Sequence, residues 1–247
     1  MIKKGINDAL GLFGYQIQKV KKAEPVVQPV AEASMFEALN RCKSRGLNVS
    51  TVIDVGASDG SWSRECIKYY PNANYLLFEA QKPYVPKLDQ FKEQYKNVDY
   101  VLAAAGHREG SIYFDNSVLW GGLASDTPFE NNCIEVPVVK VDNEVAKKNL
   151  KGPYLIKLDT HGFEVPILEG ATETLKNASL VVIEAYNYQL TNDSLKFYQL
   201  CEYMSNKGFS PIELVDIMLR KYDNSLWQMD LFFVPNSNKE FSYNEFE

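Results

Sequence analysis

The chain has 247 residues, of which 45% are hydrophobic and 23% are charged, and this ordinary globular composition excludes a disordered chain, a collagen and a coiled coil. Its 26 basic and 32 acidic residues leave a formal net charge of −6. Proteins that neutralise many phosphates usually carry a basic surplus, so we expect no nucleic-acid partner.

The four cysteines and two histidines limit the kinds of metal or redox site that the chain can contain. No two cysteines have the C-x-x-C spacing of a zinc or redox site, and two histidines add little to a Cys/His zinc centre. Widely spaced cysteines indicate free thiols in a reducing compartment. No apolar run approaches the roughly 18 residues of a membrane span, and the first residues lack the apolar core of a signal peptide. We therefore expect a cytoplasmic protein.

Residues 1–34 are predicted to precede the folded domain, which we assign to residues 35–247 with a polar C-terminal tail. In residues 1–22, apolar side chains recur at steps of four and three, which is typical of an amphipathic helix. Five lysines and one aspartate give this segment a charge of 5 − 1 = +4. Such a helix can contact an anionic membrane, although we favour docking on the main domain. Residues 23–34 contain two prolines and are predicted to be an extended linker.

From residue 35 onward, helical patterns alternate with short apolar runs. Helices are predicted over 35–45, 61–70, 83–95, the segment around Pro166, and 193–207. Strands are predicted over 51–55, 75–80, 98–106, 111–115, 134–141, 154–159, 179–186, 209–217 and 228–234, with a polar loop over 116–132. This alternation predicts an α/β fold with a doubly wound, Rossmann-like, mostly parallel sheet. The last two strands have no helix between them, which predicts an antiparallel edge.

The run VIDVGASDG, residues 52–60, takes a strand into a turn that contains Gly56 and Gly60. Glycines allow a backbone to approach a ligand closely, and α/β sheets bind ligands where their strands end. Glu79 ends the next strand, 79 − 60 = 19 residues later, where a carboxylate can accept hydrogen bonds from a ribose. The unit therefore predicts a nucleoside-containing ligand, although a tight turn without a ligand is the simpler alternative.

The charge of this loop indicates which nucleoside. Its glycine spacing differs from the dinucleotide G-x-G-x-x-G pattern, and Asp54 and Asp59 would repel a pyrophosphate. S-adenosylmethionine carries a sulfonium and an ammonium group, so we predict it as the cofactor. The run also matches G-x-S-x-G, which gives a serine hydrolase using Ser58 as an alternative. That alternative is disfavoured because the motif follows the first convincing strand.

A second constellation follows the strand over 154–159. Asp159, His161 and Glu164 lie at its end, and Glu184 ends the next strand. The carboxyl ends of parallel strands share one sheet edge, so we expect these side chains to converge on the nucleoside pocket. His161 is a candidate general base because its ordinary pKa is near 6.5, with Asp159 as the alternative.

Hard cations such as Mg²⁺ prefer carboxylate ligands. The possible ligands for Mg²⁺ are therefore Asp159 and Glu184, together with Asp142. We consider this metal without predicting it. Aromatic residues are candidates for a wall that stacks on a sugar: Tyr113, Phe114, Trp120, Tyr186 and Tyr188. Of these, Tyr113 and Phe114 are better explained as core residues. Residues 120–122 lie in the long polar loop and are a candidate lid.

The runs VIDVGASDG, LLFEA, IKLDTHGFEVPILEGA and QMDLFFV together resemble the FkbM-type family of class I S-adenosylmethionine-dependent methyltransferases. The resemblance covers residues 50–235. It implies a seven-stranded sheet with an antiparallel last strand, and O-methylation of a hydroxyl of a carbohydrate or related natural product. A non-catalytic nucleoside-binding module of the same fold is the third hypothesis.

The resemblance also implies roles for single residues. The methionine part of the cofactor would be held by Asp54, Gly56, Ala57 and Gly60. Glu79 would bind the ribose beside Ala80, and Ala104 and Ala105 would approach the adenine. Asp159 and Glu164 match the family pattern. His161 stands where the family more often has Glu or Gln, so no family role transfers to it.

Overall fold

The computed structural model describes residues 33–192 and 194–246. The predicted helix over 1–22 and nearly all of the predicted linker lie outside these residues. Among the described residues, no helix combines the length and the apolarity that crossing a membrane requires.

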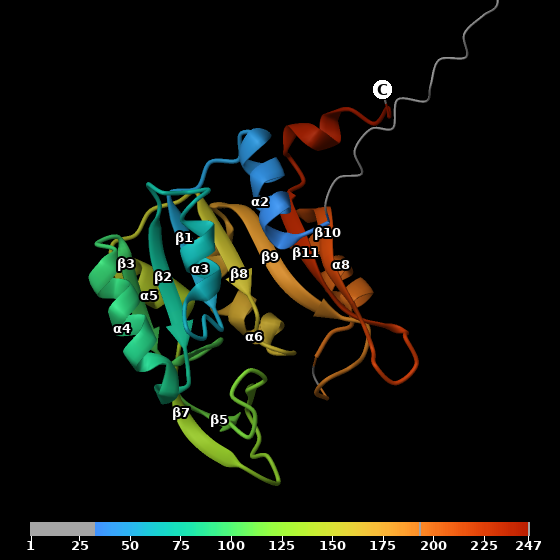
Figure 1. The fold of residues 1–247 in the computed structure, drawn as a ribbon. Helices are drawn as coiled ribbons and strands as arrows, with labels where there is room; N and C mark the ends of the chain where they lie inside the picture. The colour runs from blue at the N-terminus through green and yellow to red at the C-terminus, as the bar shows by residue number, and fades with distance from the viewer. Residues whose placement is uncertain (1–32, 193, 247) are drawn as a thin grey trace, which may run out of the picture. The chain divides into compact units, whose positions relative to one another are not determined.

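A mostly parallel sheet forms the centre of the fold (Figure 1). The described residues give it seven strands in the order β10-β11-β9-β8-β1-β2-β3. Their bounds are β1 Thr51–Val55, β2 Asn74–Glu79, β3 Val98–Leu102, β8 Tyr154–Leu158, β9 Ala178–Tyr186, β10 Phe209–Leu219 and β11 Leu226–Pro235. β11 is antiparallel to both of its neighbours, β9 and β10, and the other pairs of this sheet are parallel. The predicted α/β class and antiparallel last strand are therefore confirmed, and β11 is inserted between β9 and β10.

Burial of the central strands explains why they appear in the sequence as apolar runs. All five residues of β1 and all five residues of β8 are buried. A parallel strand covered on both faces needs such a run instead of an alternating pattern. Val52 and Ile53 point to opposite faces and belong to two separate hydrophobic clusters.

Helices cover both faces of the sheet, as the doubly wound prediction requires. The helices α2 Met35–Ser44, α3 Ser61–Cys66 and α4 Val85–Gln94 contribute to one hydrophobic cluster. The opposite cluster receives α5 Val141–Lys147, α6 Glu164–Glu169, α7 Thr172–Leu175 and α8 Phe197–Asn206. Short 3-10 turns, η1 Lys82–Tyr84 and η2 Lys239–Ser242, complete the elements. The predicted helix over 61–70 ends early at Cys66, and the chain continues as turns through Tyr69 before Pro71. The sequence reasoning missed α5.

A second, smaller sheet differs from the prediction. Its order is β4-β7-β5-β6, with β4 Ala104–Ala105, β7 Cys133–Val139, β5 Gly110–Asp115 and β6 Leu123–Ser125. The predicted single strand over 98–106 is wrong, because its last residues leave the main sheet and pair with β7. The predicted loop over 116–132 contains β6, which pairs with β5. The small sheet lies beside the carboxyl ends of the central strands (Figure 1).

Gly170, from the motif ILEGA, is a point of close backbone contact. A Cβ at this position would lie 1.9 Å from the carbonyl oxygen of Gly106. We expect Gly170→Ala to lower the free energy of unfolding by roughly 1–3 kcal/mol, because the added methyl group must displace a backbone. Urea denaturation measures this change. Gly121→Ala is the matched control, since its Cβ would meet nothing closer than 3.7 Å. Equal stabilities of the two variants would contradict the steric explanation.

Candidate functional site

A pocket opens where the central strands end, between the main sheet and the small sheet. Its wall includes the loop after β1, the end of β2, the alanines of β4, the loop after β8, and part of the 116–132 segment. The residues that matter below are Gly56, Ser58, Glu79, Ala80, Gln81, Tyr84, Ala104, Ala105, Trp120, Asp159, His161 and Phe163. The wall brings together Gly56, Glu79, Asp159 and His161, whereas Glu164 and Glu184, which were expected to converge on the same pocket, are not part of it.

Glu79 is a fixed acceptor in this pocket. The Ser58 N–H donates to its Oε2 and the Gln81 N–H donates to its Oε1, each over 2.7 Å. Burial raises the pKa of the Glu79 carboxyl, and these two backbone bonds oppose that rise. Each carboxylate oxygen has a further lone pair for a ligand hydroxyl. Ala80 and the two alanines of β4 provide an apolar surface beside it.

Gly56 is required by the fold as much as by a ligand. Its φ is +78°, and a Cβ there would lie 2.0 Å from the carbonyl oxygen of Asp159. The absence of a side chain lets the loop after β1 meet the end of β8. Ala57 and Gly60, by contrast, lie outside the pocket wall. Gly60 has a φ of +77° at the start of α3, where a Cβ would lie 2.9 Å from the Phe91 ring.

The two loop aspartates have partners within the protein. Asp59 Oδ1 accepts a bond from the Ser61 N–H at 3.1 Å, and its Oδ2 lies 2.9 Å from Lys87 Nζ. These contacts secure the start of α3, and Asp59 lies outside the pocket wall. Asp54 is fully buried beneath the pocket. Neither carboxylate is presented to a ligand, which differs from the role that the sequence predicted for them.

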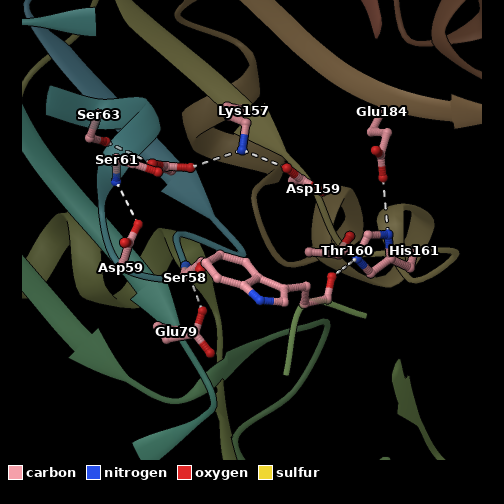
Figure 2. A network of polar contacts seen from close by, with 12 residues as sticks. Ser58, Asp59, Ser61, Ser63, Glu79, Lys157, Asp159, Thr160, His161 and Glu184 are labelled. Carbon is pink, nitrogen blue, oxygen red and sulfur yellow. Dashed lines mark hydrogen bonds and ion pairs between the residues drawn. The ribbon is translucent and has the colours of Figure 1, made fainter. Parts of the chain in front are cut away.

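Asp54 belongs to a buried charge network that includes Lys157, and Figure 2 shows the contact between Lys157 and Asp159 in that network. Lys157 Nζ lies 2.9 Å from Asp159 Oδ2 and 3.5 Å from Asp54 Oδ1. Ser63 Oγ donates to Asp54 Oδ2 over 2.7 Å. Burial would lower the pKa of Lys157, but the two carboxylates outweigh it and raise the pKa. The ammonium group therefore stays charged in the interior and fixes Asp159 at the strand end. Sequence reasoning missed Lys157, although a lysine inside the apolar run YLIKLD was a visible signal.

The second constellation assembles around His161 (Figure 2). Its Nδ1 lies 3.0 Å from Glu184 Oε2 and 2.7 Å from the Tyr186 hydroxyl, which itself donates to Glu184. Its Nε2 lies 3.2 Å from the Trp120 carbonyl oxygen. Gln228 Nε2 donates to Glu184 Oε1 over 2.5 Å. The pair His161–Glu184 is thus oriented by neighbours from β9 and β11, and Gln228 was not expected from the sequence.

The protonation of His161 differs from its expected near-neutral titration. Burial alone would lower the pKa of the imidazole, but the hydrogen bond and charge of Glu184, with help from Asp159, raise it to about 9. His161 is therefore mostly an imidazolium at neutral pH. The raised pKa makes it a stronger base once its proton has left.

Ligand atoms of Asp159, His161 and Glu184 lie within 4.8 Å of one another, so these three could hold a cation. Asp142 does not join them. Its carboxylate accepts bonds from the Glu173 N–H at 2.9 Å and the Thr174 N–H at 2.8 Å, at the start of α7.

Glu164 is also directed away from the pocket. It is buried, and its Oε1 accepts bonds from the Gly162 N–H at 2.8 Å and Thr160 Oγ1 at 3.3 Å. Burial raises the pKa of Glu164, and the Gly162 bond opposes that rise. This side chain shapes the loop that carries His161, whose φ is +53°. Its predicted place among the catalytic groups is replaced by this supporting contact.

The aromatic residues that were predicted to form one wall do not lie together. Phe114 and Trp120 line the pocket, whereas Tyr113 does not. Tyr186 and Tyr188 both pack on Trp227, with ring centroids 5.8 and 5.4 Å apart.

Ser58 has a φ of +53°, yet neither histidine hydrogen-bonds to it in the described structure. Both ring nitrogens of His161 have other partners. Among the described residues, the Ser58 hydrolase alternative therefore has no histidine hydrogen-bonded to its nucleophile.

Comparisons with a family model and with solved structures found matches to this chain. Residues 54–211 match the family described as "Methyltransferase FkbM domain". The chain is similar to the crystal structure of methyltransferase FkbM from Methylobacillus flagellatus KT, with 16% identity and a TM-score of 0.50, over 74% of this chain and 43% of that chain. It is also similar to Aeropyrum pernix fibrillarin in complex with S-adenosyl-L-methionine, with 10% identity and a TM-score of 0.48, over 80% and 74% of the two chains. No curated protein matches the chain.

We expect Lys157→Met to lower the free energy of unfolding by about 3–5 kcal/mol, because it leaves Asp54 buried without its counter-charge. Urea denaturation measures the change. The control is Lys176→Met, which removes an exposed lysine paired with Glu173 and should cost less than about 1 kcal/mol. Adding Asp54→Asn to Lys157→Met should recover part of the loss. Equal stabilities of the two single variants would contradict the network described above.

Proposed function

Because this chain belongs to the FkbM methyltransferase family, we propose that it transfers a methyl group from S-adenosylmethionine to a hydroxyl of a carbohydrate or related natural product. The observation that carries the proposal is the position of two groups in one pocket. Glu79 lies on one side as an acceptor for a nucleoside, and His161, oriented by Glu184, lies on the other side. The first group suits a cofactor and the second suits removal of a proton from an acceptor.

The residues of the pocket fit the cofactor. Glu79 would hold the ribose hydroxyls, because its oxygens are fixed by two backbone donors and keep free lone pairs. Ala104, Ala105 and Phe163 offer an apolar surface for a base. Asp159, at the end of β8, would face the positive charge of the methionine part. When bound, S-adenosylmethionine supplies a methyl group on a sulfonium, which makes that methyl group electrophilic.

The protein's own part is to orient the acceptor and receive its proton. An acceptor hydroxyl within hydrogen-bond reach of His161 Nε2 would lose its proton to the neutral imidazole as the new C–O bond forms. General-base help of this kind is worth roughly 10²–10⁴-fold in rate. Glu184 holds the ring by Nδ1 and stabilises the imidazolium that results. This is the arrangement by which a carboxylate assists a histidine base in other enzymes.

A divalent cation is the less suitable partner for this site. Lys157 Nζ lies 2.9 Å from Asp159, and protonated His161 brings a positive charge to 3.0 Å from Glu184. Each of the two carboxylates therefore already has a cationic partner within the chain, which lessens the attraction for a doubly charged metal ion. We propose that His161, and not Mg²⁺, activates the hydroxyl.

Cofactor binding is the first test. Isothermal titration should give saturable binding of S-adenosylmethionine and S-adenosylhomocysteine, and none of NAD. Glu79→Gln should weaken both affinities by roughly 10–100-fold, because a hydrogen bond to a charged group is lost. Glu65→Gln, at an exposed pair with Lys68, is the control and should bind normally. A folded protein that binds neither S-adenosyl compound would contradict the proposal. Binding without turnover of any hydroxyl acceptor would favour the non-catalytic module.

The pH dependence of turnover tests the base. Only the neutral imidazole accepts a proton, so kcat/KM should rise about tenfold per pH unit and level off near the pKa of about 9. The groups that face the ring are Glu184, Tyr186 and Asp159, and the first and last of these raise its pKa. His161→Gln should lower kcat/KM by roughly 10²–10⁴-fold and remove the slope.

Treatment with EDTA should leave this profile unchanged. A wild-type rate that does not vary with pH, together with loss of activity in Asp159→Asn, would assign the proton to Asp159 instead. A rate abolished by EDTA and restored by Mg²⁺ would assign the activation to a metal.

A further inference from the structure

Residues 116–122 connect β5 to β6 and cross the pocket. Leu119, Trp120 and Gly122 all contribute to the pocket wall. A Cβ on Gly122 would lie 2.4 Å from the Phe114 ring, so the chain passes closely over the aromatic side chain below it. This segment therefore covers part of the space that a cofactor and an acceptor must share.

The segment is held by polar contacts and not by burial of its side chains. Gln81 Nε2 and the Tyr84 hydroxyl both donate to the Leu119 carbonyl oxygen, over 2.9 and 2.8 Å. The Val118, Leu119 and Trp120 side chains are 58%, 41% and 65% exposed. A few hydrogen bonds of about 0.5–1.5 kcal/mol each are a weak anchor beside a packed core. Elements anchored in this way open at low free energy without global unfolding.

The third anchor involves the proposed base. The Trp120 carbonyl oxygen lies 3.2 Å from His161 Nε2, the nitrogen that Glu184 and Tyr186 leave free. A carbonyl oxygen only accepts, so Nε2 carries a hydrogen in this state. In the proposed reaction the same nitrogen must receive a proton from the acceptor hydroxyl. The carbonyl and the hydroxyl cannot occupy this position together.

We infer that residues 116–122 form a lid that Gln81 and Tyr84 hold over the pocket, and that the acceptor hydroxyl replaces the Trp120 carbonyl at His161 Nε2. Gln81 and Tyr84 are then positioning residues, because they act on the reaction through the lid. The Trp120 carbonyl marks the site of the reacting oxygen. The lid itself is independent of the reaction, whereas the exchange at Nε2 rests on the proposed function.

The sharpest variant is Tyr84→Phe. It removes the hydroxyl that donates to Leu119 and keeps the ring that packs on Trp120, whose centroid lies 5.7 Å away. Tyr100→Phe is the matched control, because its hydroxyl donates to Asp89, a residue outside this pocket wall. Gln81→Leu tests the second anchor and keeps the backbone N–H that serves Glu79.

Two measurements on the full chain are combined. Hydrogen–deuterium exchange followed by mass spectrometry reports opening of residues 116–122 without any ligand. We expect exchange of this segment to be roughly 2–10-fold faster in Tyr84→Phe and in Gln81→Leu, as loss of one hydrogen bond predicts. Stopped-flow fluorescence should show S-adenosylhomocysteine leaving faster by a similar factor. Tyr100→Phe should match the wild type in both measurements.

The outcomes separate the lid from the reaction. Unchanged exchange in both anchor variants would overturn the lid, whatever the activity. Faster exchange with no methyl transfer to any acceptor would support the lid and overturn the proposed function. If the enzyme is active, Tyr84→Phe should lower the KM for the acceptor more than it changes kcat. The reason is that the free variant breaks the contact between the Trp120 carbonyl and His161 more easily. A fall in kcat alone would overturn the exchange at His161.

Discussion

A single ammonium group, buried between two carboxylates, ties the centre of the sheet to the pocket above it. Lys157 comes from β8, Asp54 from β1, and Asp159 from the end of β8. Removing the charges of Lys157 and Asp54 from water costs free energy, which their mutual attraction, the hydrogen bonds and the partly exposed Asp159 offset. The two neighbouring strands therefore have one favourable arrangement, in which Lys157 reaches both carboxylates. The backbone agrees with it, since the Asp159 N–H donates to the Val55 carbonyl over 3.0 Å.

The positions of the pocket groups follow from that arrangement. Asp159 is fixed at the end of β8, and the loop that begins there turns at His161 and Gly162 with positive φ values. Glu164 accepts the Gly162 N–H and holds the turn from below. His161 is thereby delivered to Glu184 on the adjacent strand. One side of the site is thus fixed by the buried charges around Lys157. The 116–122 segment on the other side is held by hydrogen bonds to the carbonyl oxygens of Leu119 and Trp120.

Sequence reasoning could predict this fold and part of the site for a physical reason. The strands β1 and β8 are buried on both faces, so their apolar runs and the loops that follow them are visible in the amino-acid order alone. Glu79 and Asp159 were correctly placed at the pocket because strand ends share an edge. The glycines in the loops were also visible in the sequence, but the reason why each position requires glycine was not. Gly56 and Gly170 avoid backbone atoms of distant segments, which no local pattern encodes.

The features of the site and the fold that could not be predicted depend on contacts between residues far apart in the chain. The protonation of His161 is set by Glu184, 23 residues later, and Glu184 is held in turn by Gln228 from β11. Asp54, Asp59, Glu164 and Asp142 looked like free acidic groups, yet each is used by a neighbouring lysine, hydroxyl or helix start. The break of the strand after Leu102 needed β7, which offers a competing pairing partner more than 30 residues later.

The insertion of β11 between β9 and β10 affects the order in which the protein can assemble. A chain leaves the ribosome from its N-terminus, and β10 is therefore made before the strand that joins it to the sheet. Until residues 226–235 appear, β9 is an open edge and β10 has no place beside it. Gln228 and Trp227, which support Glu184 and Tyr186, arrive with that same strand. A nascent chain thus contains both His161 and Glu184 before β11 is made, but the contacts from Gln228 and Trp227 that support them form only when β11 joins the sheet.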